Sequence, residues 1–178
     1  MTFSPCWFWE KGVEESVLKV LEEEIKTLEL LPSMLSQGRN DTDVRNSSSN
    51  ALPSHHWFTG IMTNFAIHAN REAGWKRTLE FPEVTQIAEY KPDQYYKWHA
   101  DINPFSVAEY ERKVSVVCLI TDPSEFEGGE LELEHVSAPK LKRGSVIAFP
   151  SILRHQVTPV TKGKRVTATC WVIGPQKW

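Results

Sequence analysis

The chain lacks the features that mark membrane, secreted and nucleic-acid-binding proteins. Among its 178 residues, no apolar run approaches the roughly 18 residues that a membrane span needs. The first residues, MTFSPCWFWEKG, lack the basic-then-apolar order of a signal peptide, so the cytoplasm is the expected location. The formal net charge is -3, and without a basic excess nucleic acid is not expected to be a partner.

Cysteine is also scarce. The three cysteines, Cys6, Cys118 and Cys170, are far apart in the chain and form no C-x-x-C pair. This pattern predicts free thiols in a reducing compartment, without a disulfide framework. The remaining composition, 40% apolar and 24% charged, is that of an ordinary globular domain with a core of its own.

The first part of the chain predicts two helices and a loop. Apolar residues recur at helical spacing over 13–30, which predicts an amphipathic helix that ends at Pro32. Residues 33–53 are polar and poor in aromatics, and they predict a long loop that could act as a lid. A second helix is expected over about 55–72, ending near Gly74.

From Trp75 onward the chain consists of short runs rich in Val, Ile, Thr and aromatics. Strands are expected at WKRTLEF, TQIAEY, YYKWHAD, KVSVVCLIT, ELELEHV, SVIAFPS, HQVTPV and RVTATCWVI. Many short strands without helices between them favour a sandwich or barrel. The sequence therefore predicts one mainly β domain over 1–178, with a helical buttress over about 1–74 and a jelly-roll body over about 75–178.

Three side chains in this body could together bind a metal ion. His99 and Asp101 stand two apart in a predicted strand, so they should project from the same face. With His155 from a later strand they would form a set of two histidines and one carboxylate, which suits non-haem iron(II) and leaves coordination positions open. The H-x-D pair alone is weak evidence, because His99 could be a strand histidine and Asp101 could open a turn.

Arg165 lies ten residues after His155, at the start of another predicted strand. A guanidinium facing an apolar interior is costly unless it meets an anion, and its planar fork matches a carboxylate. 2-Oxoglutarate has such a carboxylate at one end and can chelate iron through the other. Thr167, Thr169 and Trp171 should share the face of Arg165.

These residues belong to a longer ordered pattern, which resembles the prolyl-4-hydroxylase-like group of 2-oxoglutarate/iron(II) dioxygenases, including the bacterial and phage PKHD-type hydroxylases. The matching elements are Tyr90-x5-Tyr96-x2-His99-x-Asp101, Arg112-x2-Ser115, Phe126-x-Gly128-Gly129-Glu130-Leu131, Gly144-x4-Phe149-Pro150-Ser151, His155-x-Val157-x-Pro159-Val160-x2-Gly163-x-Arg165 and Trp171. The resemblance implies a double-stranded β-helix and a bacterial or phage-infected cell.

The resemblance also implies roles for individual residues. His99, Asp101 and His155 would ligate Fe(II). The co-substrate 2-oxoglutarate would be bound by Arg165, Tyr90, Leu131, Val157 and Thr169. Trp171 and Tyr96 would lie near the metal, and Val117 would line the pocket. In the polar loop, Arg39 and Arg45 could meet the substrate.

The implied reaction is hydroxylation of a C–H bond by dioxygen with decarboxylation of 2-oxoglutarate, ascorbate being an optional reductant. The resemblance favours a prolyl residue in a peptide or protein as substrate. A free amino acid, another small molecule or a nucleobase stays open. So do two other classes, a zinc hydrolase and a non-catalytic jelly-roll module that binds metal.

The sequence departs from the family pattern at two positions. Leu119 stands where the family often has a tyrosine that assists the arginine, so Arg165 would act alone or with another hydroxyl such as that of Thr167. Asp93 stands near the position of a frequent glycine between the two tyrosines.

Overall fold

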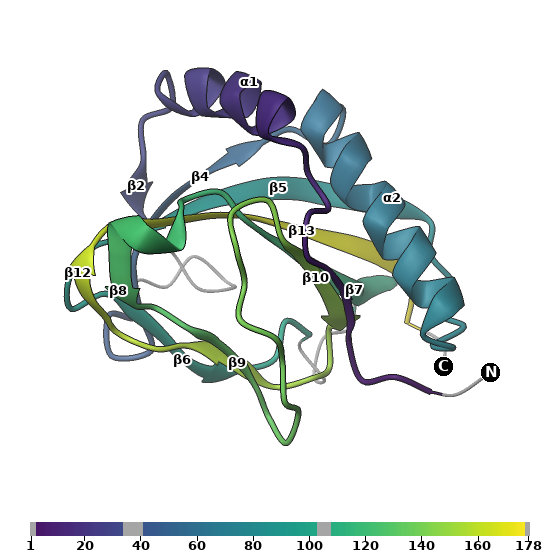
Figure 1. The fold of residues 1–178 in the computed structure, drawn as a ribbon. Helices are drawn as coiled ribbons and strands as arrows, with labels where there is room; N and C mark the ends of the chain where they lie inside the picture. Colours follow the sequence, from purple (N-terminus) through teal and green to yellow (C-terminus); the bar gives the residue numbers. More distant parts are fainter. Residues whose placement is uncertain (1–2, 34–40, 103–107, 177–178) are drawn as a thin grey trace.

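The computed structural model describes residues 3–33, 41–102 and 108–176, which form antiparallel sheets covered on one side by helices (Figure 1). The helices are α1 (Glu15–Ile25), α2 (Trp57–Glu72) and the short 3-10 helix η1 (Pro123–Glu125). The strands are β1 (Trp7–Trp9), β2 (Leu31–Pro32), β3 (Arg45–Asn46), β4 (Ser48–Leu52), β5 (Phe81–Tyr90), β6 (Tyr95–His99), β7 (Tyr110–Leu119), β8 (Phe126–Gly128), β9 (Leu131–Leu133), β10 (Val146–Pro150), β11 (His155–Val157), β12 (Val160–Gly163) and β13 (Arg165–Pro175).

The strands pair in the order of a jelly roll, as the sequence predicted. The large sheet has the order β1-β10-β7-β13-β5-β4-β2, and a smaller sheet has the order β3-β6-β11-β9. The strands β12 and β8 form a separate pair. Figure 1 shows the smaller sheet across from the large one, with both helices on the far side of the large sheet.

Strand β13 shows how the sequence sorts residues between the two sides of the large sheet. Successive side chains of a strand point to opposite faces. Its apolar set packs into the core beneath the helices: Val166, Ala168, Cys170 and Val172. Its alternate set lines a cavity between the sheets: Arg165, Thr167, Thr169 and Trp171.

The helices complete that core with their apolar faces. Leu18 and Leu21 of α1 are buried, as are Phe58 and Met62 of α2. The three cysteines are free, as expected, and Cys118 and Cys170 are buried. No helix within 3–33, 41–102 or 108–176 has the length and apolar character required to cross a membrane.

The predicted boundaries were wrong in the N-terminal half. The second half of the predicted loop 33–53 forms β3 and β4, which pair with β6 and β5. The first strand of the predicted body does not begin at Trp75, because β5 begins at Phe81. The intervening residues form no strand: Lys76 has a positive φ, and the Asn70 side chain bonds the backbone of Arg77.

Other predicted elements are shorter in the structure, and part of the predicted lid is not placed. Helix α1 spans Glu15–Ile25 within the predicted 13–30. Strand β9 covers Leu131–Leu133 of the predicted ELELEHV, and HQVTPV divides between β11 and β12. Residues 34–40 of that lid, with Arg39 among them, lie outside the described residues.

Replacing Gly163 by alanine is expected to lower the free energy of unfolding by about 2–3 kcal/mol. Gly163 has a φ of +73°, and a Cβ there would lie 1.9 Å from the backbone oxygen of Glu125. Gly60→Ala is the matched control, because a Cβ at Gly60 in α2 meets nothing within 4 Å. It should raise stability by roughly 0.5–1 kcal/mol. Urea denaturation measures both, and equal midpoints would contradict this account of the β12 turn.

Candidate metal centre

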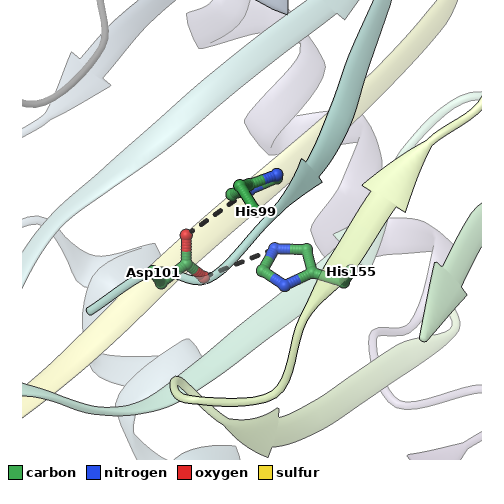
Figure 2. Close-up of side chains that lie close together, drawn as sticks. All are labelled: His99, Asp101 and His155. Carbon is green, nitrogen blue, oxygen red and sulfur yellow. Dashed lines mark ion pairs between the residues drawn. The ribbon is translucent and has the colours of Figure 1, made fainter. Parts of the chain in front are cut away.

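The smaller sheet brings His99, Asp101 and His155 to one point (Figure 2). His99 ends β6, His155 begins β11, and the two are register partners in neighbouring strands. Their Nε2 atoms lie 3.7 Å and 3.6 Å from the two carboxylate oxygens of Asp101. One donor atom from each residue lies within 4.8 Å of the others, so the three could hold a single metal ion.

Asp101 reaches this point from beyond the strand, which corrects the expectation that it stands on β6. The strand ends at His99, and the backbone N–H of Asp101 donates to the carbonyl of Ser151 at 2.9 Å. The Ser115 hydroxyl donates to Asp101 Oδ2 at 2.6 Å and lies 2.9 Å from the Ser151 hydroxyl. Ser115 of β7 thus holds the carboxylate, and Ser151, which directly follows β10, holds the Asp101 backbone.

Backbone contacts set which nitrogen of each imidazole faces the centre. Nδ1 of His99 lies 2.7 Å from the carbonyl of Lys97, and Nδ1 of His155 lies 3.0 Å from the carbonyl of Leu153. A carbonyl only accepts hydrogen bonds, so each Nδ1 carries the proton. The lone pairs on both Nε2 atoms are therefore directed at the Asp101 side, as metal-binding histidines require.

The centre favours a neutral His99 and an ionised Asp101. Burial, reinforced by the neighbouring His155, lowers the pKa of His99 to about 3. Burial alone would raise the pKa of Asp101, but the imidazoles of His155 and His99 and the bond from Ser115 outweigh it and keep that pKa below its usual range. These are the protonation states in which both residue types bind metal.

Arg165 is a buried cation in the wall of a cavity that the three metal-site residues also line. Its exposed fraction is 2%, and burial lowers its pKa to about 10. Its guanidinium lies 5.5 Å from the ring centre of Tyr90, its partner across the β13–β5 pair. Among the described residues, no hydrogen bond or ion pair joins it. A buried guanidinium without a counter-charge is costly, so this one suits an anionic ligand.

The cavity between the metal site and Arg165 has a volume of about 40 Å³. It brings together the predicted site residues that the structure describes: His99, Asp101, His155, Arg165, Tyr90, Leu131, Val157, Thr169, Trp171, Tyr96, Arg45 and Val117. Thr167 also lines it, whereas Leu119 does not. A hydroxyl that could assist Arg165 is therefore present on β13.

Arg45 is a buried part of this cavity although its surroundings in the sequence predicted a loop. Its Nε donates to Ser47 Oγ at 3.0 Å and its Nη2 donates to Gln86 Oε1 at 2.7 Å. The guanidinium lies 4.8 Å from the Tyr96 ring centre, and that ring stacks on His99 at 3.4 Å. Burial raises the pKa of Tyr96 to about 12, so its hydroxyl stays protonated. Arg45 and Tyr96 thus support the His99 side of the metal site.

Sequence reasoning missed the surroundings of Trp171. Arg112 lies 3.7 Å above the Trp171 ring and donates to Glu83 through Nε and Nη2, at 3.0 Å and 2.7 Å. The Nε1 atom of Trp171 is buried and, among the described residues, has no hydrogen-bond partner. An unpaired indole donor in the wall of a cavity can bind an acceptor on a ligand. The spacing of Arg112 and Glu83 in the sequence gives no sign of this contact.

A jelly roll with two histidines and one carboxylate inside has the architecture of metal-dependent oxygenases. The family model described as the 2OG-Fe(II) oxygenase superfamily matches residues 85–173, which is half of the chain. The chain belongs to this superfamily, whose members use Fe(II), 2-oxoglutarate and dioxygen. The donor set of His99, Asp101 and His155 and the unpaired Arg165 fit these two groups.

Comparison with individual proteins gives the same family. A PKHD-type hydroxylase of Acidovorax ebreus (strain TPSY) is 39% identical over 107 residues, which are 56% of this chain and 46% of that protein. The chain spans between about a quarter and a half of the length of the curated relatives it matches.

Solved structures share the fold at low sequence identity. The viral collagen prolyl hydroxylase of Paramecium Bursaria Chlorella virus-1, in its 2OG complex, has a TM-score of 0.73 and 20% identity over 96% of this chain and 97% of that one. A prolyl hydroxylase of Trichoplax adhaerens, in complex with a hypoxia inducible factor peptide, has a TM-score of 0.75 and 15% identity over 94% of this chain and 83% of that one.

Proposed function

We propose that this protein hydroxylates a C–H bond and couples that step to the oxidation of 2-oxoglutarate. The observation that carries the proposal is the content of one cavity. His99, Asp101 and His155 meet at one end, and a buried, unpaired Arg165 lies in its wall. Dioxygen would be the oxidant, with bound iron supplying the redox chemistry. One oxygen atom would be inserted into the substrate C–H bond, and the other would enter 2-oxoglutarate, which would leave as succinate and carbon dioxide.

The side chains of the protein would bind, orient and exclude water. His99, Asp101 and His155 would hold the iron, and the Ser115 hydroxyl would keep the carboxylate turned toward it. Arg165 would take the distal carboxylate of 2-oxoglutarate. The Thr167 hydroxyl, two residues along the same face of β13, is the donor available where the family often has a tyrosine.

We propose a prolyl residue in a peptide or protein as the substrate. The two solved structures above are described as prolyl hydroxylases, and one of them holds a peptide. The cavity supports this choice because aromatic walls from Trp171 and Tyr96 suit a saturated ring.

The test is turnover with iron(II) and 2-oxoglutarate against a panel of proline-containing peptides, free amino acids, small metabolites and nucleobases. Mass spectrometry should detect the gain of one oxygen on a peptide, with succinate formed in equal amount. If only a free amino acid, small molecule or nucleobase gains oxygen, the protein is an oxygenase but the proposed prolyl substrate is wrong. If no substrate yields succinate and 2-oxoglutarate does not bind, the oxygenase function is wrong. A non-catalytic metal-binding module and a zinc hydrolase would then remain as the alternatives.

Removing the Ser115 hydroxyl should weaken iron binding by about tenfold to a hundredfold, because partners of metal ligands orient those ligands. Ser115→Ala leaves Asp101 without its 2.6 Å bond. Ser145→Ala is the matched control, since Ser145 is equally buried and donates to the Glu10 carbonyl instead. Anaerobic competition with an iron(II) chelator measures both affinities. An unchanged affinity in Ser115→Ala would show that the hydroxyl does not orient Asp101.

A further inference from the structure

A second and larger cavity lies beside Arg165. Its volume is about 900 Å³, and Arg165 and Leu131 belong to its wall as well as to that of the metal-side cavity. It extends along β8 and β9 and the segment 134–142 that follows β9. The apolar side chains of its wall include Leu119, Phe126, Leu131, Leu133, Val136 and Leu141. This volume is within the range of small-molecule sites in proteins.

Leu119 gives this cavity an apolar surface next to the guanidinium. It is 2% exposed on β7 and is the register partner of Thr167, two residues from Arg165. Gly129 lies on the other side of Arg165, where an added Cβ would come within 2.8 Å of the Arg165 side chain. The stem of Arg165 is therefore packed closely, and the residue belongs to the walls of both cavities.

Most of the other charges around this cavity belong to exposed ion pairs, and the half-buried Glu132 accepts a hydrogen bond from Gln156 Nε2 at 2.6 Å. Glu130 pairs with Lys140, and Lys142 pairs with Glu10, all exposed. Glu127 pairs with Lys162, also exposed. Among the charged wall residues that the structure describes, Arg165 alone is fully buried, and no hydrogen bond or ion pair is formed by it. The cavity thus combines an apolar wall with one unpaired positive charge.

We propose that this cavity binds a monocarboxylic acid with an unbranched apolar tail, whose carboxylate pairs with Arg165 and whose tail lies along Leu119, Leu133 and Val136. A carboxylate matches the guanidinium, and an apolar tail matches the wall. Because the same guanidinium would bind the distal carboxylate of 2-oxoglutarate, such an acid would exclude the co-substrate. This consequence rests on the proposed function, whereas binding of the acid does not.

Calorimetric titration of the metal-free protein with hexanoate, octanoate and decanoate, each below its micelle concentration, measures the binding. The Kd should fall by about fourfold for each added methylene, because burying one methylene contributes about 0.8 kcal/mol to the binding free energy. 1-Decanol has the same tail without the carboxylate and should bind at least about tenfold more weakly than decanoate. Decanoate should also raise the apparent Kd of 2-oxoglutarate for the protein loaded anaerobically with iron(II).

Two variants separate the tail from the charge. Ala138 lines the large cavity and not the metal-side cavity, so Ala138→Trp should fill it and weaken decanoate by about tenfold or more while 2-oxoglutarate still binds. Ala138→Met is the smaller change if the tryptophan prevents folding. Ala51→Trp, at an exposed position of β4 outside both cavities, is the matched control and should bind decanoate as the wild type does. Arg165→Met should lose both ligands.

The outcomes distinguish this inference from the proposed function. Wild-type protein that binds 2-oxoglutarate but not decanoate would overturn the inference and leave the function intact. Decanoate that binds equally to Arg165→Met, or together with 2-oxoglutarate, would also overturn it. Decanoate binding through Arg165 without any binding of 2-oxoglutarate would support the acid site and reject the oxygenase function.

Discussion

Arg165→Ala is expected to lower the affinity for 2-oxoglutarate by about two to three orders of magnitude, while the affinity for iron(II) stays close to that of the wild type. The guanidinium is buried, belongs to β13 beside β5, and is not one of the three metal-site donors. Its removal would leave a buried carboxylate without its partner, which typically costs on the order of 3–5 kcal/mol. Leu119 cannot replace the donor. Paired anaerobic titrations measure the effect, first with iron(II) and then with 2-oxoglutarate.

Arg165→Lys is the informative control. A lysine keeps the charge but not the two-pronged geometry, so it should recover part of the lost affinity. Wild-type affinity for 2-oxoglutarate in Arg165→Ala would mean that the co-substrate is anchored elsewhere and that its assigned orientation is wrong.

Asp101→Ala is expected to abolish hydroxylation, with a loss of about a hundredfold or more. The carboxylate is the charged member of the donor set, and the two Nε2 atoms face it at 3.7 Å and 3.6 Å. Two neutral imidazoles alone should hold the metal weakly and out of position. The measurement combines oxygen gain by mass spectrometry with the iron(II) Kd of the variant.

Asp43→Ala serves as the matched control, because Asp43 is exposed and lies outside both cavities. It should turn over substrate at the wild-type rate. Hydroxylation by Asp101→Ala at that same rate would exclude Asp101 as a ligand and would require a different metal site.

The sequence predicted that His99, Asp101, His155 and Arg165 lie together, and the structure brings all four into the wall of one cavity. The H-x-D pair alone is weak evidence, so the prediction depended on the longer ordered pattern of residues around it. Even so, the strand argument for His99 and Asp101 was only partly right. Asp101 lies past the end of β6 and is directed by bonds with Ser115 on β7 and with Ser151, which directly follows β10.

The strands β3 and β4 could not be predicted, because their pairing partners lie far along the chain. Residues 45–52 are mostly serine, asparagine and other polar types that resemble a loop. Their backbone pairs with β6 and β5, and Ser33, Ser47 and Arg45 are buried through mutual hydrogen bonds. Burial of polar residues through such contacts leaves no periodic pattern in the sequence.

The large cavity and the unpaired Trp171 donor were also beyond sequence reasoning. A cavity is the space that side chains from several elements fail to fill, here β7, β8, β9 and the segment 134–142. The replacement of a frequent tyrosine by Leu119 was noticed in the sequence as a missing donor. Its position beside a second cavity appears only when β7 and β13 are placed together.

An anaerobic visible spectrum tests the central claim most directly, namely that one cavity binds iron(II) and 2-oxoglutarate together. Iron(II) should first be added to the protein, followed by 2-oxoglutarate, with the same additions to Asp101→Ala and Arg165→Ala. A charge-transfer band in the visible region should form in the wild type only when both are present. At co-substrate concentrations near the wild-type Kd, both variants should lack it. A wild-type protein that binds iron(II) but gives no band at saturating 2-oxoglutarate would contradict the account.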